Sequence, residues 1–126
     1  MGILVDVKCS SFILPESVLD PALAALKALA EDRPGEFHEP DGVLEATDLL
    51  GAVNADGWEV ERDANGLTRL WYGGDKAPHD SDEEWPRSIF ETLAPFATAG
   101  AVEVFFDGER AWALRLADGE LTVESD

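Results

Sequence analysis

The densest group of side chains with metal-ligand chemistry is the run His79-Asp80-Ser81-Asp82-Glu83-Glu84. Hard cations bind several carboxylate oxygens, so this run is the best candidate for a cation site in the chain. It lacks the D-x-[DN]-x-[DN]-G pattern of a calcium loop. A helix start also explains its composition, because Ser81 and Glu84 have the spacing of a capping box and Asp82 falls in the first turn. We therefore expect no resident metal.

Other catalytic signatures are missing or incomplete. Gly73-Gly74-Asp75-Lys76 offers backbone amides and a lysine, but it lacks the strand-to-helix context of a phosphate loop and is interpreted as a flexible exit from a hairpin. No Cys/His set has the spacing of a zinc site, because the chain holds only one cysteine and two histidines. Cys9 lies on the apolar side of a predicted strand, which indicates a buried structural thiol. His38 and His79 fall in acidic segments and are predicted to be solvated. No cofactor is expected.

The charge of the chain limits its partners. The 126 residues include 27 acidic and 9 basic side chains, a formal net charge of -18. Nucleic acid and anionic membranes would be repelled, whereas a basic protein surface would be attracted. Selection for solubility, or salt adaptation, would give the same composition. The apolar N-terminal run is interrupted by Asp6 and Lys8, so no signal peptide or membrane span is predicted, and we expect a cytoplasmic protein.

Alternation and helical periodicity organise the first half of the chain. Ile3, Val5, Val7 and Cys9 predict a strand with one apolar face, which extends over residues 12–14 past a bulge. A helix follows, with Asp20-Pro21 as its cap, and Pro34-Gly35 ends it. Its apolar face consists of Leu19, Leu23, Leu26 and Ala30. Residues 31–48 are predicted to be an acidic surface loop, and Thr47 to cap a short helix that ends near Gly57.

The second half predicts a hairpin, a helix and a three-strand meander. Residues 58–62 and 67–72 alternate around Asn65-Gly66, a sequence that favours a turn with positive φ. Residues 73–80 are predicted to form a loop. Trp85, Ile89, Leu93 and Phe96 then share a helical face. Pro86 means that this helix either begins there or has a distorted first turn. Three short strands follow, over residues 102–106, 112–116 and 121–123.

These elements predict one α+β domain spanning residues 1–126. The expected architecture is a mostly antiparallel sheet of about five to six strands, with two to three helices packed on one face. The other face is then open to solvent and mostly acidic. On it we place Asp6, Lys8, Glu59, Glu61, Glu103, Phe105, Arg115 and Glu124. Trp71 falls opposite the apolar positions of its strand and is predicted to be exposed. The predicted partner-binding residues are Asp6, Glu59, Glu61, Trp71, Glu103 and Phe105.

Several motifs of the C-terminal half resemble those of a known group. These are the acidic helix start, Leu93-Ala94-Pro95-Phe96 at the helix end, and the aromatic strand before a turn at residues 112–119. With Gly57-Trp58-Glu59, they resemble small acidic uncharacterised proteins of high-GC bacteria and their phages. The resemblance covers about residues 82–123. It implies a cytoplasmic or phage-encoded α+β protein of unassigned activity, and it transfers no catalytic residue.

Three functional hypotheses remain open. The first is a non-enzymatic module that uses acidic side chains to bind a basic protein surface, of the inhibitor, immunity-protein or phage-accessory type. The second is a nucleic-acid mimic, in which carboxylates on one elongated face replace phosphates. The third is a metal-dependent hydrolase using the acids near His79. The sequence neither supports nor excludes homodimerisation through an edge strand of the meander.

Overall fold

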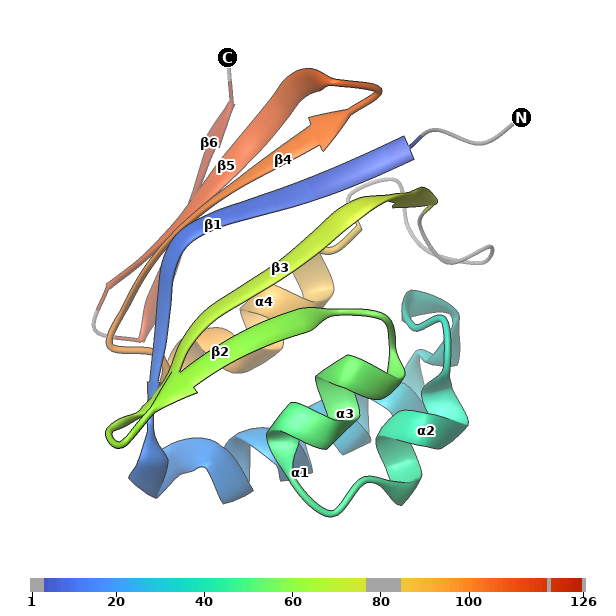
Figure 1. Ribbon diagram of the computed structural model, residues 1–126, viewed down its shortest axis with the longest axis vertical. Coiled ribbons are helices and arrows are strands. Elements are labelled where there is room, and N and C mark those ends of the chain that lie inside the picture. Colours follow the sequence, from blue (N-terminus) through green and yellow to red (C-terminus); the bar gives the residue numbers. More distant parts are fainter. Residues whose placement is uncertain (1–3, 77–84, 118, 126) are drawn as a thin grey trace.

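The protein forms an α+β domain, described here from a computed structural model that covers residues 4–76, 85–117 and 119–125 (Figure 1). Six strands make one sheet in the order β2-β3-β1-β4-β5-β6, and every neighbouring pair is antiparallel. The strands are β1 (Leu4–Pro15), β2 (Glu59–Asp63), β3 (Gly66–Lys76), β4 (Ala99–Phe106), β5 (Glu109–Ala117) and β6 (Glu120–Ser125).

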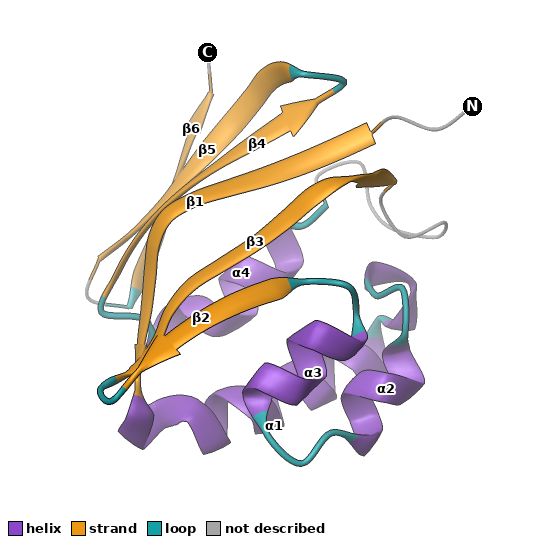
Figure 2. Cartoon of the chain, in the orientation of Figure 1, coloured by secondary structure: helices purple, strands orange, loops and turns teal. Residues whose placement is uncertain are grey.

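The helices gather on one side of this sheet (Figure 2). They are α1 (Leu19–Asp32), α2 (Pro40–Glu45), α3 (Leu49–Ala55) and α4 (Arg87–Leu93), with single 3₁₀ turns η1 (Glu16–Val18), η2 (Pro34–Glu36) and η3 (Ala94–Phe96). The antiparallel sheet with helices on one face is confirmed, and the predicted element order is confirmed apart from the additional helix α2. The predicted capping box of Ser81 and Glu84 lies outside the described residues.

The long strand β1 holds the two halves of the sheet together, because it pairs with β3 on one side and β4 on the other. Its inward side chains are all buried: Val5, Val7, Cys9, Phe12 and Leu14. Strict alternation would place Cys9 and Phe12 on opposite faces. The register of β1 against β4 shifts between Cys9 and Ser11, so a bulge brings Phe12 back to the core. The predicted extension past a bulge is confirmed.

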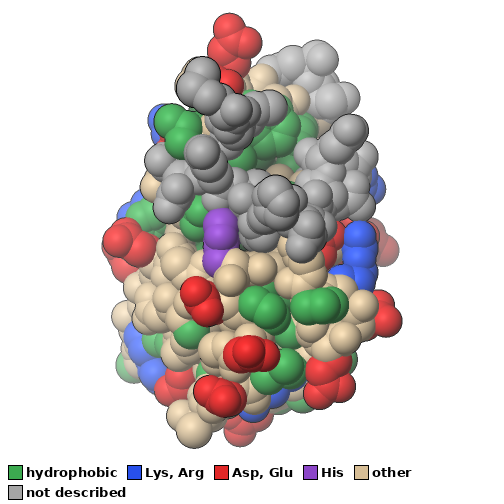
Figure 3. Space-filling model, turned by 90° about the vertical axis from the view of Figure 1, so that its right-hand side faces the viewer, with side chains coloured by type: hydrophobic (Ala, Val, Ile, Leu, Met, Phe, Trp, Pro, Cys, Tyr) green, Lys and Arg blue, Asp and Glu red, His purple; other side chains and the backbone are tan. Residues whose placement is uncertain are grey.

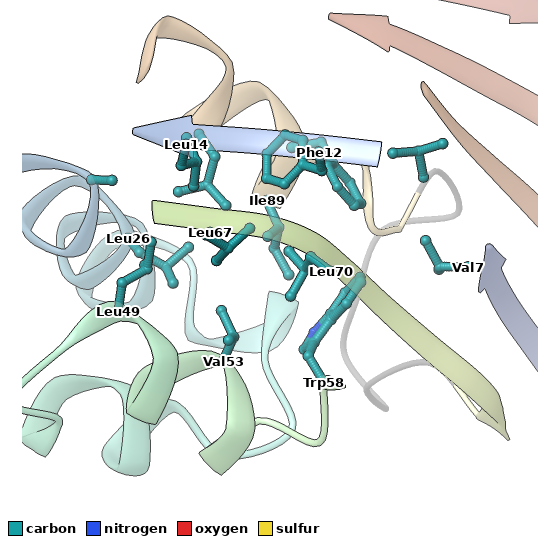
Figure 4. Packing of buried hydrophobic residues seen from close by; sticks show 14 of the residues in the cluster. Val7, Phe12, Leu14, Leu26, Leu49, Val53, Trp58, Leu67, Leu70 and Ile89 are labelled. Atoms are coloured by element: carbon teal, nitrogen blue, oxygen red, sulfur yellow. The ribbon is translucent and has the colours of Figure 1, made fainter. Parts of the chain in front are cut away.

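The core lies between the sheet and the helices (Figure 4). Phe12 and Leu70 contribute to it from the sheet, Leu26 from α1, Val53 from α3 and Ile89 from α4. Trp58 and Trp85 are both at most 2% exposed, and their ring centroids are 5.6 Å apart. Large buried aromatic side chains dominate the apolar area removed from water, so this end of the core contributes strongly to stability.

The β2–β3 hairpin follows the predicted pattern. Val60 pairs with Leu70, and the Trp58 and Tyr72 rings are 5.4 Å apart. Gly66 has φ +134°, a conformation that favours glycine. The end of β1 also packs against this glycine, and the Glu16 amide donates to the Asn65 carbonyl at 2.8 Å. The turn therefore closes the hairpin and receives the end of β1 at the same place.

The prediction of a surface loop at residues 31–48 is wrong. The segment forms η2 and α2, and it buries Glu36, Phe37 and Val43. Helix α2 has only six residues, too few for an apolar stripe to show periodicity in the sequence. The predicted loop at 73–80 is also wrong in part, because β3 continues to Lys76 and its residues 75 and 76 pair with β1. Gly73 and Gly74 are therefore strand residues and not a flexible exit.

Two helix starts differ from the predicted caps, and a third agrees with a predicted alternative. Helix α1 begins at Leu19 after η1, so Asp20 lies in its first turn and does not cap it. Asp48, and not Thr47, caps α3, and its side chain accepts from the Gly51 amide at 2.7 Å. Helix α4 begins at Arg87, directly after Pro86, which is one of the two predicted alternatives. Among the described helices, none is long and apolar enough to cross a membrane.

Candidate functional site

The sheet brings the six predicted binding residues to one face. Asp6 pairs with Phe105 and Lys8 with Glu103 across β1 and β4, while Glu59 pairs with Trp71 across β2 and β3. Directly paired residues of an antiparallel sheet share a face. Because the neighbours Val7, Leu70 and Tyr72 are buried against the helices, these residues point away from them. We call this side the open face. That it binds a partner stays a prediction.

The open face carries mixed charge and is not mostly acidic. Four of the nine Lys and Arg residues lie on it: Lys8, Arg69, Arg110 and Arg115. The closest ion-pair contacts are 3.3 Å for Glu61–Arg69, 3.3 Å for Glu103–Arg110 and 2.8 Å for Glu124–Arg115. Exposed pairs of this kind stabilise the fold by only ~0–1 kcal/mol each. They do offset much of the negative charge that a basic partner would need.

The two aromatic residues of the open face are half-buried, each beneath a cation. The Lys8 ammonium lies 4.6 Å from the centre of the Phe105 ring, and the Arg69 guanidinium lies 4.8 Å from that of Trp71. Cation–π contacts at exposed sites contribute about 0.5–1 kcal/mol. Trp71 is therefore less exposed than the sequence predicts. Alternation correctly indicated its face but could not indicate the covering arginine.

A shallow depression of about 320 Å³ occupies the β4–β5–β6 part of the open face. Ala101 and Ala113 line it between the Glu103–Arg110 and Arg115–Glu124 pairs. Small alanine side chains line the depression, and charged side chains of both signs surround them, so it does not select for a cation or an anion.

Among the described residues, the excess negative charge is concentrated in residues 16–57, which include α1, α2 and α3. Residues 16–57 hold ten acidic side chains against two basic ones, Lys27 and Arg33. Glu36 and Asp56 are buried, and the other eight acids are exposed. These eight, which we call the acidic layer, are Glu16, Asp20, Glu31, Asp32, Glu39, Asp41, Glu45 and Asp48. Arg33 is close to the buried Glu36, with a nitrogen–oxygen distance of 3.0 Å.

Figure 3 shows the side of the molecule on which α2 lies. In its lower half, acidic side chains are spaced apart with hydrophobic side chains between them, while Lys and Arg lie toward the margins. The acid count of residues 16–57 was visible in the sequence, and so were α1 and α3, but η2 and α2 were not.

Polar contacts beneath the acidic layer attach it to the core. The Tyr72 hydroxyl lies 2.9 Å from Nε2 of His38. The Trp85 indole N–H donates to the Glu36 carbonyl at 2.8 Å, and Asp56 Oδ1 accepts from the Glu39 amide at 2.9 Å. His38 is therefore half-buried and hydrogen-bonded, which corrects the prediction of a solvated loop histidine. These contacts fix residues 36–39 against β3 and α3.

Asp56 is the most unusual titratable group of this cluster. It is 2% exposed, and burial raises the pKa of its carboxyl. The Glu39 amide, the His38 charge and amide, and the Trp58 side chain oppose the shift. A carboxyl that is costly to ionise often marks a functional site. Here it accepts a hydrogen bond from the amide of Glu39, the residue directly before α2, and this contact gives it a structural role.

The remaining candidates for chemistry are the Cys9 thiol and groups of metal-ligating side chains. Cys9 is buried, as predicted, and burial raises the pKa of its thiol. In the described ranges, no group of three or more His, Cys, Asp and Glu side chains is arranged to hold a metal ion. His79 and the candidate cation run at 79–84 lie outside those ranges, so the hydrolase hypothesis is not tested.

The chain matches no protein-family model, no curated protein and no solved structure. The resemblance to small acidic proteins of high-GC bacteria and their phages therefore stays a prediction.

Proposed function

We propose that this protein is a non-enzymatic binding module whose acidic layer docks on a basic protein surface. The observation that carries the proposal is the separation of charge. Residues 16–57 carry eight exposed carboxylates against two basic residues, one of which is held near a buried glutamate. Glu16 of this set pairs with Arg62 of β2, whereas arginines accompany three of the acids of the open face. The net attraction for a cationic surface is therefore greatest at the helices.

The anchoring of the acidic layer supports the same proposal. Residues 36–39 are tied to Tyr72, Trp85 and Asp56 by three hydrogen bonds of 2.8 to 2.9 Å. A surface that is already ordered loses less conformational entropy on binding. Its charge would accelerate encounter with a basic partner, and the association rate would fall with added salt. An inhibitor, an immunity protein or a phage accessory factor would each use such a surface.

A pair of charge-neutralised variants tests the proposal. Glu31→Gln/Glu45→Gln removes two acids near the C-terminal ends of α1 and α2, where negative charge does not assist the helix. Glu109→Gln/Glu120→Gln removes two exposed acids of the meander, so the two double variants have the same net charge. Both variants and the wild type are used to capture partners from host lysate at low and high salt.

The expected result is a basic protein that the wild type and the meander variant retain at low salt and the helical variant loses. Equal retention by both variants would show that net charge alone determines binding and would overturn the assignment to the acidic layer. Capture of a nucleic-acid-binding protein that DNA displaces would favour the nucleic-acid mimic over the general module. If every captured protein stayed bound at high salt, that result would argue against an electrostatic interface.

A further inference from the structure

Strand β2 forms one edge of the sheet, with β3 as its neighbour (Figure 1). Four of its five residues are exposed, and Val60 is half-buried. Among the described residues, no backbone–backbone hydrogen bond reaches β2 beyond its ladder to β3. In an antiparallel strand, alternate residues point their N–H and C=O groups away from the paired neighbour. The outer side of β2 is therefore a template for one more strand.

The charge of this edge selects its partner. Glu59, Glu61 and Asp63 are all exposed. Within the described ranges Glu59 takes part in no ion pair, while Glu61 has a 3.3 Å contact with a half-exposed arginine. The positive charge of Arg62 is offset by Glu16, both of whose carboxylate oxygens lie 3.0 to 3.1 Å from one guanidinium nitrogen.

Charged residues on an edge commonly prevent unwanted pairing, and that is the simpler interpretation of this strand. Acids, however, exclude only some partners. They disfavour an acidic strand, including β2 of a second copy of this chain, and they favour a strand with Lys or Arg at alternate positions. An edge whose charges have one sign therefore disfavours strands of that sign and favours strands of the opposite sign.

Two contacts place this edge beside the acidic layer and hold it rigid. The Trp58 amide, directly before β2, donates to the Val53 carbonyl of α3 at 2.9 Å. The Arg62–Glu16 pair joins the other end of β2 to η1. The strand at the opposite edge of the sheet, β6, has no such contacts with α3 or η1 among the described residues. Its Glu124 already forms an ion pair with Arg115 at 2.8 Å.

We propose that the outer edge of β2 accepts an extended basic segment of the partner as a seventh strand, with Lys or Arg side chains opposite Glu59 and Glu61. The inference deepens the proposed function and rests on it, because it names the form in which the basic partner is recognised. Main-chain hydrogen bonds supply affinity in such strand addition, and alternate side chains supply specificity.

The test uses synthetic peptides of identical charge. One peptide alternates lysine with threonine over eight residues, and two others carry N-methyl groups on every second amide, one in each phase. Binding is measured by calorimetry with the wild-type protein, and amide hydrogen exchange of residues 59–63 is followed with and without peptide. We expect the unmodified peptide to slow exchange in β2. Methylation in the phase that faces β2 should weaken binding at least ~10-fold, equivalent to about 1.4 kcal/mol.

Two results would overturn the inference. Equal binding by all three peptides would show attraction by charge without strand addition, and the proposed function would stand. Absence of binding, or binding that leaves exchange of residues 59–63 unchanged, would remove the strand template. The capture experiment with the helical variant would then decide the proposed function independently.

Discussion

The Tyr72 hydroxyl and Nε2 of His38 lie 2.9 Å apart, joining the middle of β3 to the segment between η2 and α2. Their rings are also nearly parallel, with an interplanar angle of 11° and centroids 5.6 Å apart. Tyr72 is buried and His38 half-buried, so the bond is shielded from most of the solvent. It is one of the contacts by which the sheet sets the position of the acidic layer.

Removal of this hydroxyl should weaken the fold. A typical intramolecular hydrogen bond contributes about 1 kcal/mol, and Tyr72→Phe also leaves a half-buried ring nitrogen without this partner. We expect the variant to lose about 1–2 kcal/mol in urea unfolding. A double-mutant cycle with His38→Ala isolates the pairwise energy, which should be about 1 kcal/mol. Strictly additive effects would mean that the two side chains do not stabilise each other.

The raised pKa of Asp56 predicts that its contribution to the free energy of unfolding changes with pH in the opposite direction to that of a salt-bridged carboxylate. Because burial raises the pKa of Asp56 above its ordinary value of 3.8, the folded state binds this proton more tightly than the unfolded chain. Ionisation of Asp56 therefore destabilises the fold at neutral pH. This cost disappears as pH falls through the folded pKa toward 3.8.

The Asp56→Asn variant is the matched comparison, because its amide oxygen can still accept from the Glu39 amide. We expect the wild type to gain stability relative to this variant as the pH is lowered from 7 toward 4. Urea unfolding of both proteins across this range measures the difference, and other carboxylates cancel. A difference that stays constant with pH would contradict the raised pKa.

Gly66 is required by geometry and not only by its turn. A Cβ at this position would overlap the Leu14 carbonyl oxygen and lie 2.6 Å from the Glu16 amide nitrogen, and φ is +134°. Backbone atoms cannot move away as a side chain can, so Gly66→Ala should cost more than ~2 kcal/mol. Gly73→Ala is the control, because nothing lies within 4 Å of its Cβ position. Similar melting temperatures for the two variants would contradict this account.

The sequence predicted the parts of this fold that repeat and missed the parts that depend on single contacts. Alternation identified all six strands, and the Asn65-Gly66 pair correctly indicated the hairpin, because each is a local signal. The close approach of Leu14 and Glu16 to Gly66 is not local and left no signal. The contacts of the segment that precedes α2 are equally non-local, because residues 36–39 bond to Trp85, Asp56 and Tyr72.

The candidate site shows the same limit. Strand alternation placed Glu59, Glu103 and Phe105 on one face, and their register confirms that placement. It could not show that Arg69 would lie beside Glu61 or Arg110 beside Glu103, because each pair joins two different strands. The balance of charge on a face depends on which strands become neighbours. That is why the acidic surface lies on the helices and not where the sequence suggested.

Charge reversal at two positions of the open face separates the edge of β2 from the face as a whole. Glu59→Lys and Glu103→Lys change net charge equally and affect exposed side chains. Glu59 lies on the edge strand, whereas Glu103 lies on β4, three strands away in the order β2-β3-β1-β4. Surface substitutions of this kind usually change stability by less than ~0.5 kcal/mol, so both variants should remain folded.

We expect Glu59→Lys to weaken binding of the lysine–threonine peptide by about 10-fold, since a like charge directly opposite a lysine replaces an attractive one. Glu103→Lys should weaken it much less and mainly at low salt, where the Debye length grows beyond ~10 Å and distant charges still interact. Calorimetric titration at two salt concentrations distinguishes these effects. If the two reversals weakened binding equally, the peptide would respond to the overall field of the protein, and the edge of β2 would have no special role.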